Sequence, residues 1–412
     1  MSVTFQKPKG TEDFYPEDEA LKQVLFAKFR EVAARFGFRE VSTPAFETFE
    51  LLSQKEGEEI KEQIFTLEKR GDEQFGLRFD LTVPNTRLFL QKQKELQKPI
   101  KWMMCDRMWR YERPQKGRMR EFYQMNLEIF GSPYPETDAE VITVVIDFFK
   151  SLGLTQKDFE VRLNNRKLLQ GILTELVGEE LVDEIIRLID KREKMEEKEW
   201  EAAIKTAGVK DVKALVAALD MKTIDELENM DKNSLAQEGF LELKEVYKDL
   251  DKKFVMIDLN TARGLAYYTS TVFEIFDKEG KYRALCGGGR YDKLVELFGG
   301  TSTPATGCAV GMSTLRILLE DLKKLPVINQ NLQYYIAPLD KKFLSHATKL
   351  AGELRKTSTV ELDLMRRSLG GQMNYAKHLG AENFIVIGEN EVKSGKCTLK
   401  NLKTGKETTM QI

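Results

Sequence analysis

MWRYERPQKGRMREFYQMNLEIFG, residues 108–131, joins two largely apolar segments through a strongly charged turn. Five basic residues lie in or beside this turn: Arg110, Arg113, Lys116, Arg118 and Arg120. Because side chains alternate between the two faces of a strand, we expect Arg110 and Glu112 on one face of the entering strand. By the same period, Gln124 and Glu128 share a face of the returning strand. Polar side chains on one face of the sheet favour a binding site in an antiparallel hairpin over the alternative, a solvated basic loop.

Further strand-like segments on both sides of this hairpin predict the rest of a sheet. They lie at residues 38–46, 75–82, 100–111, 254–260, 267–277 and 282–288. Most of them follow one another without an intervening helix, which predicts an antiparallel sheet. Amphipathic helices are expected at residues 17–36 and 136–153, and the second is expected to begin with a cap from Thr137 or Asp138.

Changes in composition along the chain predict its domains. Residues 165–250 lack proline and are rich in Glu, Lys and Leu at helical spacing, which predicts an inserted helical module. After Pro326 strands and helices alternate, which predicts a separate C-terminal α/β domain. We therefore expect an α+β domain with an antiparallel sheet at residues 1–164 and 251–326, and the α/β domain at residues 330–412.

The overall composition limits the class of protein. At 412 residues the chain exceeds what one hydrophobic core usually serves, and 42% apolar with 32% charged residues is typical of a globular protein. The start lacks an apolar targeting segment, and no run approaches the roughly 18 apolar residues that span a bilayer, so we expect a cytoplasmic protein without a membrane partner. Four scattered cysteines and two histidines argue against a zinc site or a disulfide framework. With a net charge of -2, any RNA-binding surface must be local.

The hairpin resembles motif 2 of class II aminoacyl-tRNA synthetases, in the form found in the histidyl-tRNA synthetase family. In that family the first arginine binds the ATP α-phosphate and the substrate carboxylate, which the resemblance carries onto Arg110. Gln124 and Glu128 correspond to residues that hold the substrate histidine. Glu128 and a tyrosine hydroxyl would serve the two nitrogens of a neutral imidazole, which offers one donor and one acceptor. Such a pocket leaves buried groups unpaired for any other side chain.

The same resemblance implies the nucleotide site. Arg118 would meet the outer phosphates of ATP, Phe122 would lie against the adenine, and Glu112 belongs to the same ATP-binding set. A fixed guanidinium suits this chemistry, because attack of a carboxylate on the α-phosphorus builds negative charge on its oxygens. Mg²⁺ would bridge the phosphates. The implied reaction has two steps, formation of histidyl-adenylate and transfer of histidine to its tRNA.

A second resemblance lies in RGLAYYTSTVFE, residues 263–274, which is similar to a sequence specific to the family. It implies that Arg263 is a catalytic cation beside the α-phosphate and binds the substrate, as Arg110 does. Tyr267 and Tyr268 match the pair that closes around the histidine side chain. Two tyrosines in a strand are equally consistent with core packing, but an adjacent arginine favours the site. LCGGGRYDKL, residues 285–294, resembles the family's next sequence and follows in the expected order.

Other segments extend the resemblance over nearly the whole chain. PKGTEDFYP at residues 8–16 matches the family's N-terminal segment, and the first helix with GFREVSTPAFE resembles the dimer-forming motif 1, which implies a homodimer. The segment MRRSLGGQMNYAKHLGA, residues 365–381, resembles the anticodon-binding domain and implies a tRNA partner. Within RFDLT, the resemblance implies that Asp80, Leu81 and Thr82 bind the amino acid. A carboxylate suits the substrate ammonium, although an Asp that caps its own turn is the alternative.

The sequence also departs from the family pattern. Ala266 replaces the usual Asp, and Ser270 replaces the usual Gly. Where motif 3 usually has a Glu-Arg pair, this chain has Ser313 and Thr314, and Arg316 lies about 200° further round a helix. Either the alignment slips by two residues, or ATP binds without that arginine, or catalysis has been lost. The last hypothesis makes the chain a silent paralogue that senses histidine, like a regulatory subunit of ATP phosphoribosyltransferase, but such paralogues typically lack the anticodon-binding domain.

Overall fold

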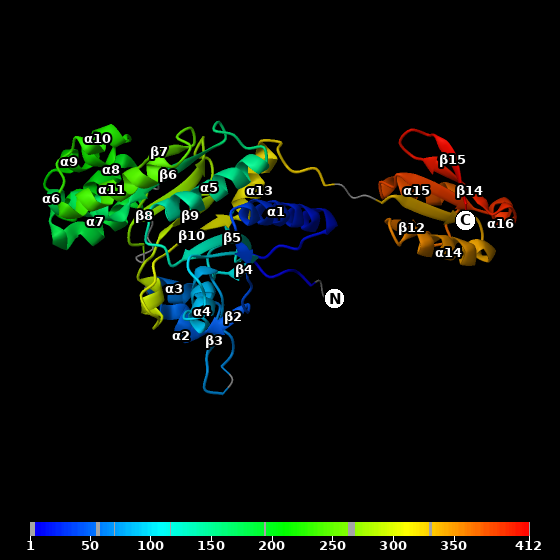
Figure 1. Ribbon diagram of the computed structural model, residues 1–412, viewed down its shortest axis with the longest axis horizontal. Coiled ribbons are helices and arrows are strands. Elements are labelled where there is room, and N and C mark those ends of the chain that lie inside the picture. Colours follow the sequence, from blue (N-terminus) through cyan, green and yellow to red (C-terminus); the bar gives the residue numbers. More distant parts are fainter. Residues whose placement is uncertain are drawn as a thin grey trace. The chain divides into compact units, whose positions relative to one another are not determined.

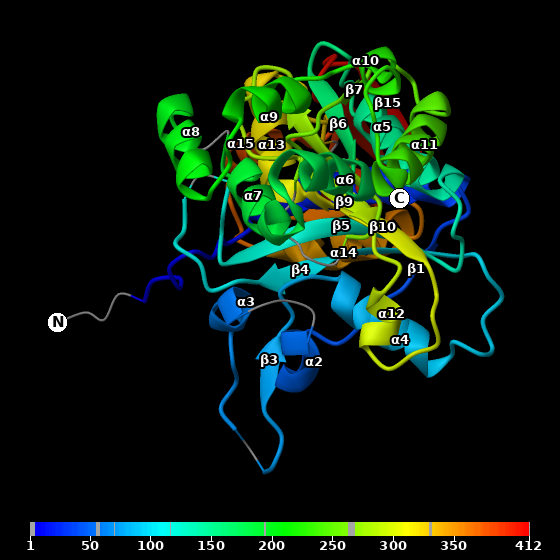
Figure 2. The same cartoon turned by 90° about the vertical axis from the view of Figure 1, so that its left-hand side faces the viewer.

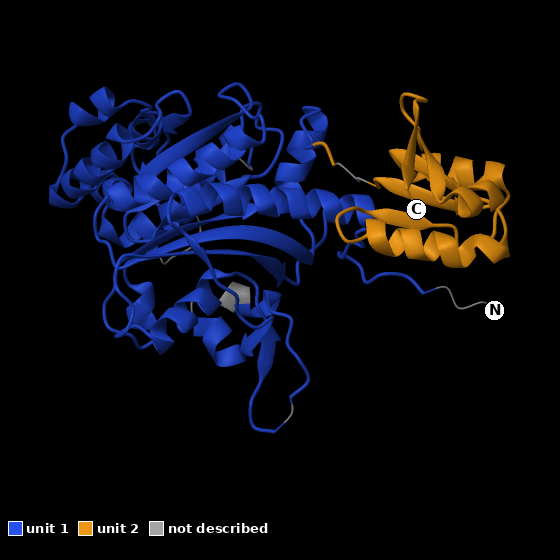
Figure 3. Cartoon of the chain, turned by 45° about the vertical axis from the view of Figure 1, so that its right-hand side comes forward, with its two compact units in different colours: residues 1–326 blue, residues 327–412 orange. Residues whose placement is uncertain are grey.

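The computed structural model describes residues 5–54, 58–69, 71–115, 117–192, 195–262, 268–328 and 332–411. Arg263 and Tyr267 therefore lie outside the described residues. The chain forms two compact units, Met1–Pro326 and Val327–Ile412, which Figure 3 colours separately. Among the described helices, none has the length and apolar character needed to cross a bilayer.

An eight-stranded sheet forms the centre of the first unit, with the order β1-β4-β5-β10-β9-β8-β6-β7 (Figure 1). The strands are β1 (Arg39–Glu40), β4 (Ile100–Trp109), β5 (Glu121–Phe130), β6 (Phe159–Asn165), β7 (Val255–Ile257), β8 (Thr271–Asp277), β9 (Cys286–Arg290) and β10 (Ala305–Gly311). Neighbouring strands are antiparallel except at the two ends, where β1 pairs with β4 and β7 pairs with β6 in parallel. This confirms the predicted antiparallel α+β fold.

The β4–β5 hairpin has the predicted position, but its loop is longer than expected. The two strands pair from Ile100, which lies opposite Phe130, to Trp109, which lies opposite Glu121, and the pairing ends there. Arg110 and Glu112 therefore belong to the loop and not to one face of a strand, which corrects that prediction. The backbone N–H of Arg110 still bonds Arg120 O at 2.8 Å, so the base of the loop remains closed.

Helices α1 (Pro16–Arg35) and α5 (Glu136–Ser151) lie together along the sheet, with the rings of Phe29 and Phe148 edge to face at 5.2 Å (Figure 1). The predicted cap of α5 is wrong. The helix begins after Pro135 and has no side-chain cap, because Asp138 is one turn inside and accepts a hydrogen bond from Arg290 on β9 instead. A long-range charged partner has overridden the local preference for capping.

The segment between β1 and β4 forms a small subdomain. It contains β2 (Phe46–Thr48), α2 (Phe49–Gln54), α3 (Glu58–Gln63), β3 (Phe75–Leu77) and α4 (Thr82–Gln91). The strand predicted for residues 75–82 ends at Leu77, and Thr82 opens α4 instead. Asp80 causes this change of direction, because its Oδ1 accepts the Val83 N–H at 3.0 Å in the first turn of the helix.

In the described part of the chain between β6 and β7, six α-helices form a module that faces the viewer in Figure 2. They are α6 (Arg166–Val177), α7 (Val182–Ile189), α8 (Glu197–Thr206), α9 (Val212–Leu219), α10 (Ile224–Glu228) and α11 (Ser234–Lys248). Helix α11 packs closely on the start of α6, because a Cβ at Gly239 would lie 2.2 Å from the Leu168 nitrogen and 2.6 Å from Asn165 Oδ1. A larger residue at 239 would push the helical module away from the end of β6.

The second unit has a five-stranded sheet with the order β12-β11-β13-β14-β15. Its strands are β11 (Tyr334–Pro338), β12 (Val360–Leu362), β13 (Asn383–Ile387), β14 (Lys396–Asn401) and β15 (Glu407–Gln411), and its helices are α14 (Leu344–Leu354), α15 (Leu369–His378) and α16 (Glu389–Ser394). Alternate residues of β11 point to opposite faces of the sheet and pack in two hydrophobic clusters. Ile336 packs with Leu350 in one, and Tyr335 stacks on Phe384 in the other. This confirms the predicted C-terminal α/β domain, although α16 was not foreseen.

Candidate functional site

A cavity of about 910 Å³ opens between the β4–β5 loop, strands β5, β9 and β10, and the start of α13 (Met312–Asp321). Eight residues that the sequence predicted for the site line it: Asp80, Thr82, Arg110, Glu112, Arg118, Phe122, Gln124 and Tyr268. They come from three separate parts of the chain, residues 80–82, 110–124 and 268, so the fold brings these predicted residues together.

One end of the cavity is formed by the arginines of the β4–β5 loop. Arg110 Nε donates to Phe79 O at 2.9 Å, and the guanidinium lies 5.2 Å from the centre of the Phe122 ring. Arg118 forms an ion pair with Glu112. Arg110 is thus held in place by the backbone and by an aromatic face, which suits a group that must stabilise charge without reorganising.

The N-terminal segment supports this loop from outside. Gly10 O accepts the backbone N–H of Arg120 at 2.8 Å, and Gly10 has a φ of +86°. A Cβ at Gly10 would lie 2.8 Å from Arg120 Cγ and 2.9 Å from Pro114 Cγ. The backbone can approach the loop only because this residue has no side chain, which explains the glycine in the PKGTE segment.

At the other end of the cavity, the lining residues Thr82, Tyr291 and Gly307 lie next to Glu128, a predicted site residue that does not itself line the cavity. Glu128 is 1% exposed, and its Oε1 accepts a hydrogen bond from Thr82 Oγ1 at 2.8 Å. Gly307 lies opposite Glu128 on β10, and a Cβ there would meet Glu128 Oε2 at 2.2 Å and the Tyr291 hydroxyl at 2.6 Å. Glycine at 307 therefore leaves the space in which a carboxylate and a phenol converge.

Tyr291 was missed by the analysis of the sequence. It is 2% exposed, lines the cavity, and its ring centre lies 6.4 Å from that of Tyr268. The signal was its place directly after the glycine-rich strand GGGR, because such a strand lets bulky neighbours approach the sheet. A Cβ at Gly289 would lie 2.8 Å from the Tyr268 ring, so that glycine makes room for Tyr268.

Within the RFDLT segment, Asp80 and Thr82 line the cavity and Leu81 does not. Asp80 lines the cavity, but it also accepts the Val83 N–H at 3.0 Å, which is the turn-capping contact of the alternative hypothesis. Leu81 does not line the cavity; it is fully buried against Met104 and Met108. The Leu81 side chain thus packs in the core, because the turn between Asp80 and Thr82 directs it there, and only the Leu81 backbone remains for the predicted binding role.

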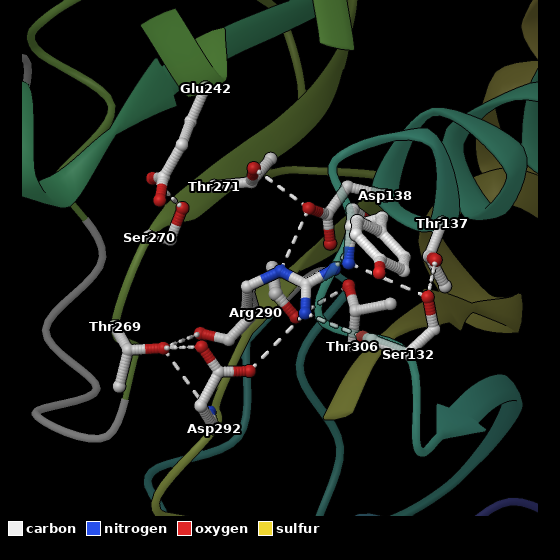
Figure 4. Close-up of polar contacts among 12 residues, drawn as sticks. Ser132, Thr137, Asp138, Glu242, Thr269, Ser270, Thr271, Arg290, Asp292 and Thr306 are labelled. Carbon is white, nitrogen blue, oxygen red and sulfur yellow. Dashed lines mark hydrogen bonds and ion pairs between the residues drawn. The ribbon is translucent and has the colours of Figure 1, made fainter. Parts of the chain in front are cut away.

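A polar network surrounds Arg290, directly before Tyr291 in the chain (Figure 4). Arg290 Nε donates to Asp138 Oδ2 at 2.9 Å, and its Nη1 donates to Asp292 Oδ1 at 3.2 Å. Thr269 Oγ1 donates to the other Asp292 oxygen at 3.2 Å. Burial raises the pKa of Asp138 against the opposing effect of the Arg290 charge. The network fixes Thr269, which directly follows Tyr268 in the chain.

Ser270, one of the departures from the family pattern, joins this region to the helical module (Figure 4). Its Oγ donates to Glu242 Oε2 of α11 at 2.5 Å, and Lys167 Nζ donates to Glu242 Oε1 at 2.6 Å. Burial opposes ionisation of Glu242, but hydrogen bonds from Lys167, Ser270 and Asn165 outweigh it and lower its pKa. A glycine at 270 would have no hydroxyl for this contact.

The start of α13 shows what replaces the usual motif 3 pair. Ser313 and Thr314 line the cavity, whereas Arg316 does not. Arg316 is bound by carboxylates outside it: Nη2 to Asp18 at 2.7 Å and Nε to Glu320 at 2.8 Å. A two-residue slip of the alignment is therefore wrong as an explanation, since Arg316 faces α1 and supplies no charge to the cavity.

Comparison with known proteins shows that the chain matches one family over most of its length. The model of the family described as histidyl-tRNA synthetase matches residues 10–315, and that of the anticodon binding domain matches residues 333–412. A histidine–tRNA ligase of Haloarcula marismortui is 37% identical over 418 residues, which cover 99% of this chain and 96% of the relative. One of Methanocaldococcus jannaschii is 37% identical over 419 residues, which cover 100% of this chain and 99% of the relative.

A solved structure has the same overall fold. The crystal structure of histidyl-tRNA synthetase from Nostoc sp. PCC 7120 matches with a TM-score of 0.84 and 26% sequence identity. The match covers 100% of this chain and 97% of that chain, so it includes both compact units and the helical module.

Proposed function

The chain belongs to the histidyl-tRNA synthetase family, and we propose how its cavity carries out the reaction of that family. It is a histidine–tRNA ligase, an aminoacyl-tRNA synthetase. The regulatory-paralogue alternative is disfavoured, because the relatives match over nearly the full chain and the C-terminal domain matches an anticodon-binding model. The observation that carries the proposal for the site is one cavity lined by Arg110 and Arg118 at one end and by two tyrosines at the other, where the buried Glu128 carboxylate lies directly behind the lining residues Thr82 and Gly307.

Histidine recognition is assigned to the end at Glu128. A buried carboxylate accepts a hydrogen bond from one imidazole N–H, and a phenol hydroxyl of Tyr268 or Tyr291 donates to the other nitrogen. Thr82 already donates to Glu128 Oε1 at 2.8 Å, which fixes the direction of the carboxylate. Asp80 and Gln124 line the same cavity and are assigned to the substrate ammonium and its surroundings.

Activation is assigned to the end at Arg110. The histidine carboxylate attacks the α-phosphorus of ATP, a new carboxylate–phosphorus bond forms, and the bond to the leaving pyrophosphate breaks. Arg110 stabilises the charge that builds on the α-phosphate oxygens, and Arg118 binds the outer phosphates. Arg263, outside the described residues, is assigned a second position at the α-phosphate on the family resemblance.

The aminoacyl group then passes to tRNA. A terminal ribose hydroxyl attacks the acyl carbon, and AMP leaves with the electrons of the broken mixed-anhydride bond. Most of the acceleration is assigned to positioning of the two reactants by the cavity walls.

The donor set fits Mg²⁺ that arrives with ATP. Among the described residues, no group of three or more His, Cys, Asp or Glu side chains could hold a metal by itself. Mg²⁺ needs only one or two protein carboxylates when phosphate oxygens complete its shell, and Glu112, which lines the cavity beside Arg118, is the candidate ligand. When bound, the ion would neutralise charge on the phosphates.

A homodimer that works in the cytoplasm is part of the proposal. Strand β1 is the last strand at its end of the sheet, and both of its residues are exposed, so the motif 1 region is accessible to a second copy. Sedimentation equilibrium tests the dimer, and cell fractionation tests the compartment.

Histidine-dependent exchange of labelled pyrophosphate into ATP tests the central reaction. The purified full chain is expected to exchange with histidine and not with the other nineteen amino acids assayed in parallel. Histidine binding without exchange would favour the silent paralogue, and exchange with another amino acid would refute the assignment of the pocket.

A further inference from the structure

Among the described residues, the nucleotide end of the cavity has few cations for the three phosphate groups of ATP. Arg118 is paired with Glu112, and the start of α13 contributes only the hydroxyls of Ser313 and Thr314. Arg316 is bound to carboxylates outside the cavity. Binding of a polyphosphate depends on cations that contact its oxygens, so a further cation is needed at this end.

The loop between β8 and β9 provides one. Of the described residues that line the cavity, Lys281 and Arg283 are the cations outside the β4–β5 loop. Lys281 forms an ion pair with Glu279 at 2.5 Å. Arg283 is exposed and forms no hydrogen bond or ion pair with any residue that the structure describes. Its guanidinium is therefore available to a ligand.

The backbone holds Arg283 at the same end of the sheet as Thr314. Leu285 O accepts the Gly311 N–H at 2.9 Å, and Gly311 directly precedes α13. A Cβ at Gly117, in the loop that contains Arg118, would lie 3.6 Å from Thr314 Oγ1. Both loops thus approach the start of α13, the β8–β9 segment at Gly311 and the β4–β5 loop at Thr314.

The loop is also anchored directly before Arg283 in the chain. The Asp277 carboxylate accepts the backbone N–H groups of Lys281 and Tyr282, both at 2.9 Å. The Tyr282 hydroxyl donates to Asp321 of α13. Because the backbone is anchored, the reach of the Arg283 side chain is limited to this end of the cavity, and binding needs to order the side chain but not the loop.

We propose that Arg283 binds the outer phosphates of ATP and supplies the charge that Thr314 lacks. The inference rests on the proposed function, because it assumes that the cavity binds ATP for histidine activation. It answers how this chain operates with a neutral pair at residues 313 and 314. In the reverse reaction the same guanidinium binds pyrophosphate.

The test is histidine-dependent pyrophosphate exchange by the full chain with the variant Arg283→Ala. The KM for ATP and the KM for pyrophosphate are each expected to rise about tenfold, the effect of one charge-assisted contact at a partly solvated site. The KM for histidine and inhibition by AMP stay near the wild-type values, since neither molecule carries the outer phosphates. Lys278→Ala is the matched control, because Lys278 is a cation of the same loop that pairs with Glu160 and does not line the cavity.

A second variant tests the exchange of roles. Thr314→Arg in the Arg283→Ala background is expected to lower the KM for ATP again, and Arg283→Lys is expected to retain part of the affinity. An Arg283→Ala enzyme with the KM values of the Lys278→Ala control overturns the assignment of Arg283, as does equal weakening of ATP and AMP. Absence of exchange in the wild type instead rejects the function on which the inference rests.

Discussion

Glu128 determines histidine binding if the proposed pocket is correct, and its replacement by alanine tests this directly. Glu128 is 1% exposed, so its interaction with an imidazole N–H is not screened by solvent. A hydrogen bond to a charged group contributes about 1.5–3 kcal/mol, and removal of the carboxylate also leaves the imidazole N–H buried without an acceptor. A loss of about 3 kcal/mol corresponds to roughly a hundredfold rise in the Kd for histidine. Thr82 loses its acceptor in the free and the bound protein alike, so that cost falls on stability.

The assay is isothermal titration of histidine and, separately, of ATP into Glu128→Ala, Glu128→Gln and the wild type. The Gln variant keeps an acceptor oxygen and is expected to lose less affinity than the Ala variant. Glu121→Gln is the control. Glu121 lies at the start of the same strand, but its carboxylate contacts Trp109 and Arg107 and does not line the cavity. Equal losses of histidine and ATP affinity in Glu128→Ala, or no loss of either, would refute the assignment of Glu128 to the imidazole.

Three further substitutions test separate parts of the account. Arg263→Ala should slow pyrophosphate exchange while the Kd for histidine stays nearly unchanged, and unaltered turnover would remove Arg263 from the mechanism. Leu81→Ala should lower the free energy of unfolding by about 2–5 kcal/mol, because it opens a cavity beside Met104 and Met108; a raised KM for histidine in a fully folded sample would instead restore Leu81 to the pocket. Glu242→Gln should destabilise the protein at neutral pH. The folded pKa of Glu242 lies below its usual value of 4.5. The extra free energy of unfolding of the wild type is therefore present above about pH 4.5 and is lost as the pH falls through the folded pKa. Denaturant unfolding of both proteins across this range measures that difference, and a difference that does not change with pH would refute a charged Ser270–Glu242 contact.

The hairpin, the antiparallel sheet and the separate C-terminal domain could be predicted from the sequence. Strand periodicity is a local property, since alternating residues such as Gln124 and Asn126 reach the same face whatever the rest of the chain does. The helical module and the α/β alternation after Pro326 are likewise local patterns of composition and period. These features were therefore accessible without coordinates.

Element ends were less predictable, because they depend on contacts from elsewhere. The strand at 75–82 gave way to a helix at Thr82, and the turn placed Leu81 in the core while Asp80 and Thr82 line the cavity. Asp138 is a residue type that often caps helices, but here its carboxylate accepts a hydrogen bond from Arg290, a buried arginine 152 residues later in the chain. A charge-assisted bond in a buried place contributes more than a solvent-exposed cap, so the long-range contact prevails.

What the sequence determined by itself is which residue types and periods are available: the charged hairpin, the paired tyrosines, the glycine-rich strand and the neutral Ser313–Thr314 pair. Only the tertiary structure decided how these are used. It placed Tyr291 against Glu128 across Gly307, turned Arg316 away to Asp18, and brought Arg283 to the end of the sheet where α13 begins. The physical reason is that charge and hydrogen-bonding energies depend on distances of a few ångströms, and close packing sets those distances between segments that lie far apart in the chain.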